Sequence, residues 1–184
     1  ITLGLADSHP ISSTTIAHAQ NVLQQARSRY IDTGYEVQTV RLSTRPVLDD
    51  LATWSLGAIL TYARELQRML DDVGIEYCSL GSVFATRPPF FLEQLELVAD
   101  ILLATNVLNM TVHLATTEHG LRFDAALPIA RIIQRLAHET PEGFGNFRFA
   151  MLACVEPGGP FFPAAYHSGP SSLSIGLQGA SLLG

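Results

Sequence analysis

The stretch FRFAMLACV, residues 147–155, is the part of the sequence that decides the fold. Its residues 151–155 are apolar at consecutive positions. Strands that are apolar at every position, and not only at alternate ones, are typical of parallel sheets with both faces buried. The stretch therefore predicts a parallel strand covered on both sides.

Outward from this stretch, short apolar runs alternate with longer amphipathic ones along the whole chain. We expect strands near residues 1–6, 36–42, 75–81, 109–115, 147–155 and 172–177. We expect helices at about 12–33, 47–73 (with a break near 55–57), 90–105 and 125–138. Because the crossovers have the length of a helix and we find no hairpin signal, the alternation predicts parallel β-α repeats. An α/β barrel and an open doubly wound sheet both fit this pattern.

The length and composition limit the number of domains and the classes of chemistry and partner. The chain has 184 residues, enough for a single α/β domain over residues 1–184, and 47% of them are hydrophobic. All 11 basic residues are arginines, which excludes a lysine Schiff base or a phosphate-loop lysine. The net charge of −6 has the wrong sign for a nucleic-acid binder. No apolar run predicts a membrane span.

The two cysteines indicate the compartment. Cys78 and Cys154 both fall in predicted core strands, so we interpret them as free, buried thiols. Two cysteines do not form a disulfide framework in a chain of this length, and free thiols favour a cytoplasmic protein. The chain begins with Ile1 inside a predicted strand, and we expect it to be cut at both ends.

The loops that follow the predicted strands are the expected place for a site. In parallel α/β folds, ligands bind beyond the carboxyl ends of the strands. Histidines, carboxylates and arginines gather in those loops, and small anions are commonly held there by arginine. The candidate catalytic residues are Asp7, His9, Glu156 and His167. The candidate substrate-binding residues are Thr44, Arg45, Arg87, Tyr166 and Ser168.

Structural interpretations compete with each of these assignments. Asp7 or Ser8 equally suits the start of a helix, and surface arginines are common. His113 lies inside an apolar strand, where a core histidine with satisfied hydrogen bonds is the usual case. Glu118 and His119 fit a solvated turn. Standard phosphate-loop, dinucleotide, zinc and nucleophile-elbow motifs are missing from the sequence, so it assigns no metal ligands and identifies no cofactor.

Several segments carry a resemblance to a known family. Ile-Thr-Leu-Gly at residues 1–4, His9-Pro10, residues 41–44 before Pro46, and above all PFFPAAYHSG at residues 160–169 resemble the domain-of-unknown-function 711 family. Residues 175–177 resemble the strand that follows in that family. The resemblance runs in order over the whole chain, and members are longer, so it implies an N-terminal portion. His9 and His167 match family positions.

The resemblance implies a fold like that of the glycyl-radical enzymes. This is a ten-stranded α/β barrel of two parallel five-stranded halves set antiparallel to each other. The first five predicted strands would form about one half, and residues 172–177 would begin the other. Radical chemistry does not follow from the fold, because it needs a cysteine on a loop inside the barrel and a glycine radical loop, whereas Cys78 and Cys154 both fall in predicted strands. We expect half a barrel to need the rest of the barrel, in the same or another chain, or a homo-oligomer.

Three functions remain open at this point. The first is an enzyme that acts on a small polar or anionic metabolite by histidine and carboxylate acid–base chemistry. The second is a non-catalytic, metabolite-binding regulatory protein that uses the same side chains. The third is a metal-dependent hydrolase. All three take a small-molecule ligand, and neither nucleic acid nor a membrane is an expected partner.

Overall fold

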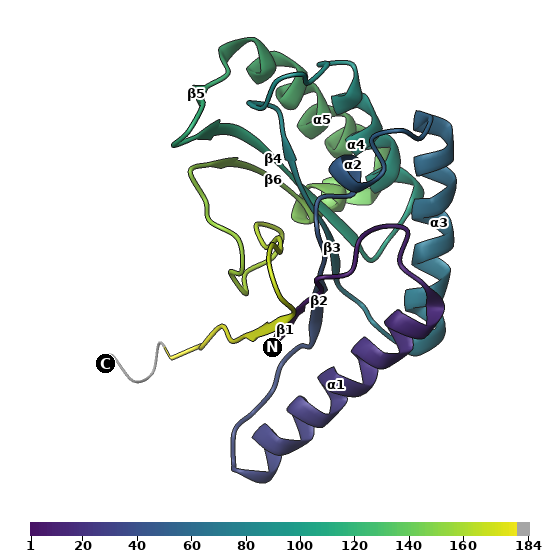
Figure 1. Ribbon diagram of the computed structural model, residues 1–184, viewed down its shortest axis with the longest axis vertical. Helices are drawn as coiled ribbons and strands as arrows, with labels where there is room; N and C mark the ends of the chain where they lie inside the picture. The colour runs from purple at the N-terminus through teal and green to yellow at the C-terminus, as the bar shows by residue number, and fades with distance from the viewer. Residues whose placement is uncertain (180–184) are drawn as a thin grey trace.

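The computed structural model describes residues 1–179 as one sheet with helices packed on it (Figure 1). The strands are β1 (Thr2–Gly4), β2 (Arg41–Ser43), β3 (Cys78–Phe84), β4 (Leu108–Thr116), β5 (Gly120–Leu121), β6 (Phe149–Ala153) and β7 (Ser172–Ser174). The α-helices are α1 (Ser13–Asp32), α2 (Val47–Asp50), α3 (Leu56–Val73), α4 (Gln94–Ala104) and α5 (Ala126–Glu139). Two segments of 3-10 helix, η1 (Phe123–Ala125) and η2 (Pro141–Arg148), flank α5.

The strand order confirms the prediction of parallel β-α repeats. β1 pairs in parallel with β2, β2 with β3, β3 with β4, and β4 with β6. Neighbours in the sheet thus follow one another along the chain. β7 pairs antiparallel with β1 at the far edge. Figure 1 shows α1, α3, α4 and α5 on one side of the sheet and the segment 154–171 on the other.

The hydrophobic core lies between the sheet and these helices. Leu42, Leu80 and Leu108 point from the strands into this layer and are at most 1% exposed. Leu23 of α1 and Leu66 of α3 are fully buried against them. Each such side chain contributes about 1.5–3 kcal/mol through burial, so this layer fixes the strands whose ends carry the polar loops.

Local signals set the helix ends. Ser12 and Ser55 cap α1 and α3 by accepting hydrogen bonds from the N–H groups of Thr15 and Ala58, at 3.1 and 3.2 Å. The cap at Ser55 produces the break expected near residues 55–57. Gly74 ends α3 in the left-handed conformation, with a φ of 74°.

The segment 154–171 runs along the sheet face that is opposite the helices. At one end of the strands, the carbonyl of Pro160 accepts hydrogen bonds from Thr2 Oγ1 at 3.1 Å and from Arg41 Nη1 at 3.5 Å. At the other end, the N–H of His167 donates to the carbonyl of Thr44 at 3.1 Å. The segment is therefore tied to β1 and β2 at both ends of the sheet.

Four expectations were wrong. The strand at 147–155 is not buried on both faces, because β6 lies at the edge of the sheet and its Met151 is 50% exposed. Cys154 is an exposed thiol beyond the end of β6, with a φ of 54°, and not a core residue. A hairpin joins β4 to β5, where Gly120 takes a φ of 70°. The helix expected from residue 90 begins at Gln94.

Candidate functional site

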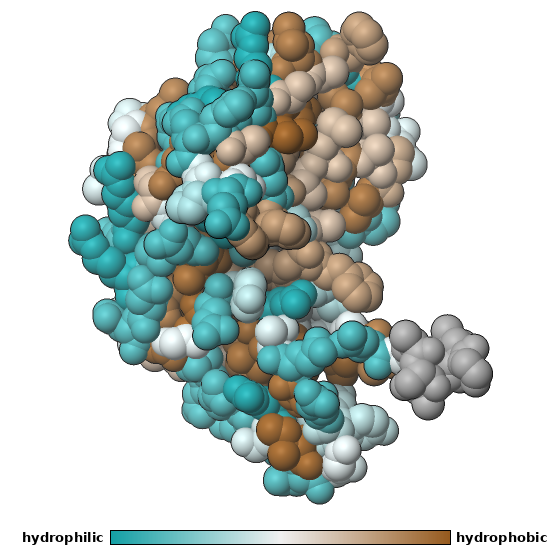
Figure 2. All heavy atoms as spheres, turned by 180° about the vertical axis from the view of Figure 1, so that it is seen from behind, coloured by the Kyte–Doolittle hydropathy of each residue, from teal (hydrophilic) through white to brown (hydrophobic). Residues whose placement is uncertain are grey.

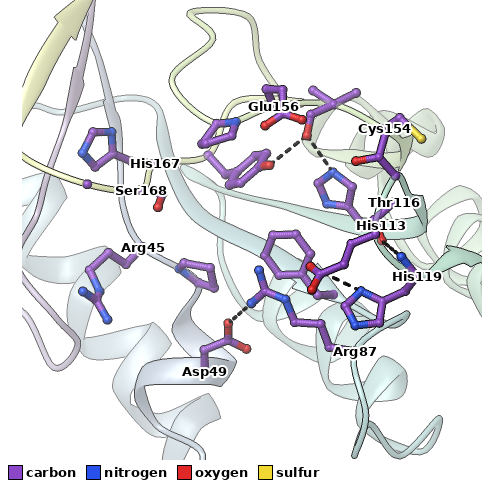
Figure 3. Close-up of a pocket in the computed structure, with 18 of the residues that line it drawn as sticks. Arg45, Asp49, Arg87, His113, Thr116, His119, Cys154, Glu156, His167 and Ser168 are labelled. Carbon is purple, nitrogen blue, oxygen red and sulfur yellow. Dashed lines mark hydrogen bonds and ion pairs between the residues drawn. The ribbon is translucent and has the colours of Figure 1, made fainter.

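A cleft of about 450 Å³ lies at the carboxyl ends of the parallel strands. It is lined by side chains from segments 45–50, 84–87, 113–119, 154–157 and 166–169. These segments lie at or just beyond the ends of β2, β3, β4 and β6 or belong to the segment that crosses the sheet (Figure 3). Of the predicted site residues, Arg45, Arg87, Glu156, Tyr166, His167 and Ser168 line this cleft.

Arg87 is held in a fixed orientation on one wall. Its guanidinium lies 3.8 Å from the centre of the Phe84 ring, and its Nη1 donates to Asp49 Oδ2 at 3.1 Å. Among the described residues its Nε and Nη2 have no hydrogen-bond partner. Burial raises the pKa of Asp49, against the opposing effect of the Arg87 charge. The stacking and the ion pair leave one edge of the guanidinium free for a ligand.

Arg45, in contrast, is fully engaged on one side by Asp50. Its Nε donates to both carboxylate oxygens at 3.1 and 3.2 Å, and its Nη2 donates to Oδ1 at 2.7 Å. The Asp50 carboxylate also accepts the backbone N–H of His9 at 2.9 Å. In Figure 3 the Arg45 guanidinium points away from Arg87. Arg45 thus holds the wall of the cleft together through Asp50, and its guanidinium does not face the interior.

His113 is a buried, neutral imidazole that faces the cleft. Its ring stacks on Phe84 with centroids 4.8 Å apart, and its Nε2 lies 3.0 Å from the carbonyl oxygen of Val155. A carbonyl only accepts, so Nε2 carries the proton and the Ser82 hydroxyl donates to Nδ1 at 2.6 Å. Burial lowers the pKa of His113, and the Val155 hydrogen bond opposes this effect.

Tyr166 and His113 hold the same carbonyl group. The Tyr166 hydroxyl donates to the Val155 oxygen at 2.8 Å, and its ring meets His113 edge-on at 5.3 Å. Burial and then the negative charge of Glu156 raise the pKa of Tyr166 to about 12. Two donors on the Val155 carbonyl fix the chain where Glu156 follows. Glu156 itself is exposed in the cleft, and no ion pair to it occurs within residues 1–179.

His167 forms a wall of the cleft and is only 3% exposed. Its Nε2 donates to the carbonyl of Pro170 at 3.0 Å, and its ring lies directly on Gly4. A Cβ at residue 4 would overlap this ring, so His167 can occupy this position only because residue 4 is a glycine. Figure 3 shows the ring turned away from His113, with Ser168 nearer the interior.

Three predicted residues lie outside the cleft. His9 is buried behind it, with Nδ1 at 2.7 Å from the Tyr62 hydroxyl and Nε2 at 3.0 Å from Thr44 Oγ1. Burial lowers the pKa of His9 to about 4. Thr44 is fully buried and donates to the carbonyl of Ser79 at 2.9 Å. Asp7 lines a separate hollow between α1 and β7. The structure therefore separates Asp7 and His9 from Glu156.

Sequence reasoning missed Asp49 and Phe84 and interpreted Glu118 and His119 only as a turn. Asp49 lies three residues beyond Pro46, outside the predicted loop after the second strand, and Phe84 lies inside the predicted loop after the third strand but carries no polar group. Glu118 and His119 line the cleft, with His119 Nδ1 at 3.7 Å from the Glu118 carboxylate. A longer loop after the second strand would have included Asp49, because the other three residues already lie in predicted loops.

Metal-binding groups and membrane-spanning helices are two further features to consider in residues 1–179. Residues 1–179 contain no group of three or more histidine, cysteine, aspartate or glutamate side chains placed to hold a metal ion. None of the helices in this range combines the length and apolar character that crossing a membrane requires.

Comparison with known proteins places the chain in a family. A family model described as "Uncharacterised ACR (DUF711)" matches residues 5–184. A UPF0210 protein of Neisseria meningitidis serogroup C / serotype 2a is 23% identical over 200 residues, which cover 100% of this chain and 44% of that protein. A UPF0210 protein of Clostridium perfringens is 21% identical over 172 residues, covering 90% of this chain and 38% of that protein.

The chain thus spans less than half the length of these curated relatives. The family match covers nearly every residue, including the segment at 160–169 and His9-Pro10, on which the resemblance rests. This protein belongs to the DUF711 family, to which the sequence motifs had pointed.

Proposed function

We propose that the protein is an enzyme that binds a small polar metabolite with an acid group in this cleft and moves a proton with Glu156. One observation carries the proposal: the free edge of the Arg87 guanidinium and the unpaired carboxylate of Glu156 line the same cleft. Its volume of about 450 Å³ suits a small metabolite.

Arg87 is the proposed anchor for the acid group. A carboxylate binds a guanidinium best through two parallel hydrogen bonds, and the Nε–Nη2 edge of Arg87 provides both donors. Because Phe84 and Asp49 already fix the plane of the guanidinium, little side-chain entropy is lost when the ligand binds.

Glu156 is the proposed general acid or base. A carboxylate in a cleft can take a proton from a bound molecule and return it, provided that it stays within hydrogen-bond reach. The two donors on the Val155 carbonyl limit its movement, which makes His113 and Tyr166 positioning residues. The proposal gives Asp7 and His9 no part in the chemistry, and His167 shapes the wall.

We also propose that the sheet is part of an α/β barrel that a further segment completes. The consecutive strand order, the helices on one side only and the antiparallel β7 all support this geometry. Large apolar side chains are exposed at the β6 edge, including Phe147 at 74% and Met151 at 50%. Figure 2 shows apolar side chains gathered on the upper part of the molecule, on the side where β5 lies in Figure 1.

Sedimentation tests the barrel. The 184-residue chain alone is expected to self-associate, because an open sheet edge and an apolar face stay uncovered. A chain that sediments as a monomer and melts cooperatively would refute the need for a completing segment.

The unpaired state of Cys78 and Cys154 is the basis for proposing a cytoplasmic setting.

A ligand screen followed by a turnover assay tests the function. Small carboxylates and amino acids are screened by thermal shift against the unmodified protein, Arg87→Gln, Glu156→Gln and the control Arg131→Gln, an exposed residue of α5. We expect Arg87→Gln to weaken the binding of simple carboxylates by roughly 10-fold or more. We expect Glu156→Gln to keep the binding of simple carboxylates and to lose about 100-fold or more in turnover.

Two outcomes would count against this proposal. If Arg87→Gln binds every hit as well as Arg131→Gln does, the cleft is not the binding site. If hits bind through Arg87 but no bound compound is converted, the protein is a binding or regulatory protein, as the second hypothesis has it.

A further inference from the structure

The charges that line the cleft do not suit a purely anionic ligand. Two arginines and four carboxylates line it: Arg45, Arg87, Asp49, Asp50, Glu118 and Glu156. Asp50 and Asp49 pair with the two arginines, at 2.7 and 3.1 Å. Glu118 and Glu156 therefore add negative charge that no arginine in the described residues offsets. The negative charge of these two carboxylates would repel a ligand that is only an anion. A ligand that also carries a positive group would be attracted by one of them.

Glu156 is the better placed of the two spare carboxylates. Glu118 has an 80% exposed side chain beside His119, at the solvent side of the cleft. Glu156 instead lies close enough for its charge to shift the pKa values of both His113 and Tyr166. Arg87 lies close enough to shift both pKa values as well. Burial is the largest cause of the pKa shift of each ring group, and in both cases the Glu156 charge raises the pKa while the Arg87 charge lowers it.

Glu156 and Arg87 line the same cleft as His113 and Tyr166. Figure 3 shows them above and below His113 in that view. Phe84 connects the two sides, because it contacts the Arg87 guanidinium, stacks on His113 and meets Tyr166 edge-on at 5.7 Å. This packing fixes Arg87 against an apolar cluster, and the same cluster holds the Val155 carbonyl that precedes Glu156.

We infer that the cleft recognises a zwitterion, a small molecule with a carboxylate at the free edge of Arg87 and a protonated amine at Glu156. The inference deepens the proposed function and rests on it. The carboxylate accepts from Nε–H and Nη2–H of Arg87, and the ammonium donates to the Glu156 carboxylate. The hydrocarbon chain between the two groups spans the part of the cleft that Phe84, His113 and Tyr166 line.

A series of matched probes tests this inference on the purified protein. The zwitterions are glycine, β-alanine, 4-aminobutyrate, 5-aminopentanoate and 6-aminohexanoate, and the comparison compounds are butyrate and butylamine. Binding is measured by isothermal titration or by ligand-detected NMR. We expect one chain length to bind at least 10-fold more tightly than butyrate and butylamine, because only that length spans both charges.

Variants then locate the two charges. Glu156→Gln is expected to remove the preference for the zwitterion while butyrate binding persists. Glu36→Gln, an exposed residue in the α1–β2 connection, is the matched control and keeps the preference. Arg87→Gln is expected to lose both the zwitterion and butyrate. Circular dichroism shows that each variant is folded.

The failures are distinguishable. If butyrate binds through Arg87 as tightly as every zwitterion, or if Glu156→Gln keeps the preference, the inference is wrong and the anion site of the proposed function stands. If neither probe class responds to Arg87→Gln, the proposed function and this inference both fall.

Discussion

His9 is predicted to make stability depend on pH. Its ring is 4% exposed and is held by Tyr62, Thr44 and the carbonyl of Arg45, and burial lowers its pKa from 6.5 to about 4. At pH values below 6.5 the unfolded chain binds a proton at His9 that the folded chain does not bind. Stability is therefore lost as the pH falls from 6.5 toward about 4. Linkage gives about 2 kcal/mol between roughly pH 7.5 and pH 5 for this one residue.

The assay compares urea unfolding at these two pH values for the unmodified protein and His9→Gln, which keeps a donor near the Nε2 position. Fluorescence of the single tryptophan, Trp54, reports locally, because its ring lies 6.1 Å from that of Tyr62. His9→Gln is expected to be less stable at the higher pH, where Tyr62 loses its partner, and to lose about 2 kcal/mol less on acidification. His18→Gln, an exposed residue of α1, serves as the control. Equal pH dependence in the unmodified protein and His9→Gln would refute this reasoning.

Three further substitutions and one labelling experiment have expected outcomes. Gly81→Ala should destabilise the protein by more than about 1 kcal/mol in urea unfolding, because the glycine has a φ of 78° and its added Cβ would lie 2.6 Å from backbone atoms of Arg45. Gly57→Ala meets no atom within 4 Å and should stabilise it by roughly 0.5–1 kcal/mol, whereas Ser55→Ala, which removes the cap of α3, should cost about 1 kcal/mol. Ellman's reagent should label exposed Cys154 in the native protein but not Cys78, whose pKa burial raises to about 12, and equal labelling of both would contradict this.

The repeating β-α pattern and the helix ends that carry a serine cap or a terminating glycine could be predicted from local sequence. Runs of apolar residues, the serine caps and Gly74 act over a few residues, so the sequence displays them directly. The length of β2 could not be predicted in the same way. Residues 36–40 stay outside the strand, because the partner strand β1 offers only Thr2–Gly4 for pairing with Arg41–Ser43.

The candidate site was predictable as a place but not in its details. The rule that ligands bind at strand carboxyl ends gave the correct loops for Arg87, Glu156 and Tyr166 to meet in one cleft. It could not show that His9 turns inward, because that orientation depends on Tyr62, 53 residues away in α3. In the same way, the exposure of Met151 depends on what lies beside the sheet edge, and a local pattern contains no such information.

The hydrogen bonds of the segment 154–171 to β1 and β2 join residues that are far apart in the chain, so we expect them to form late in folding. The hydrogen-bond partner of Thr2 is Pro160, 158 residues later in the chain, and the partner of Thr44 is His167. Long-range contacts of this kind form late, since a large loop must close before they contribute. The sheet and helices that are synthesised first can fold while the polypeptide is still emerging. Because residues 166–169 line the cleft, we expect the complete cleft to form only after this last segment has been synthesised and has docked on the sheet.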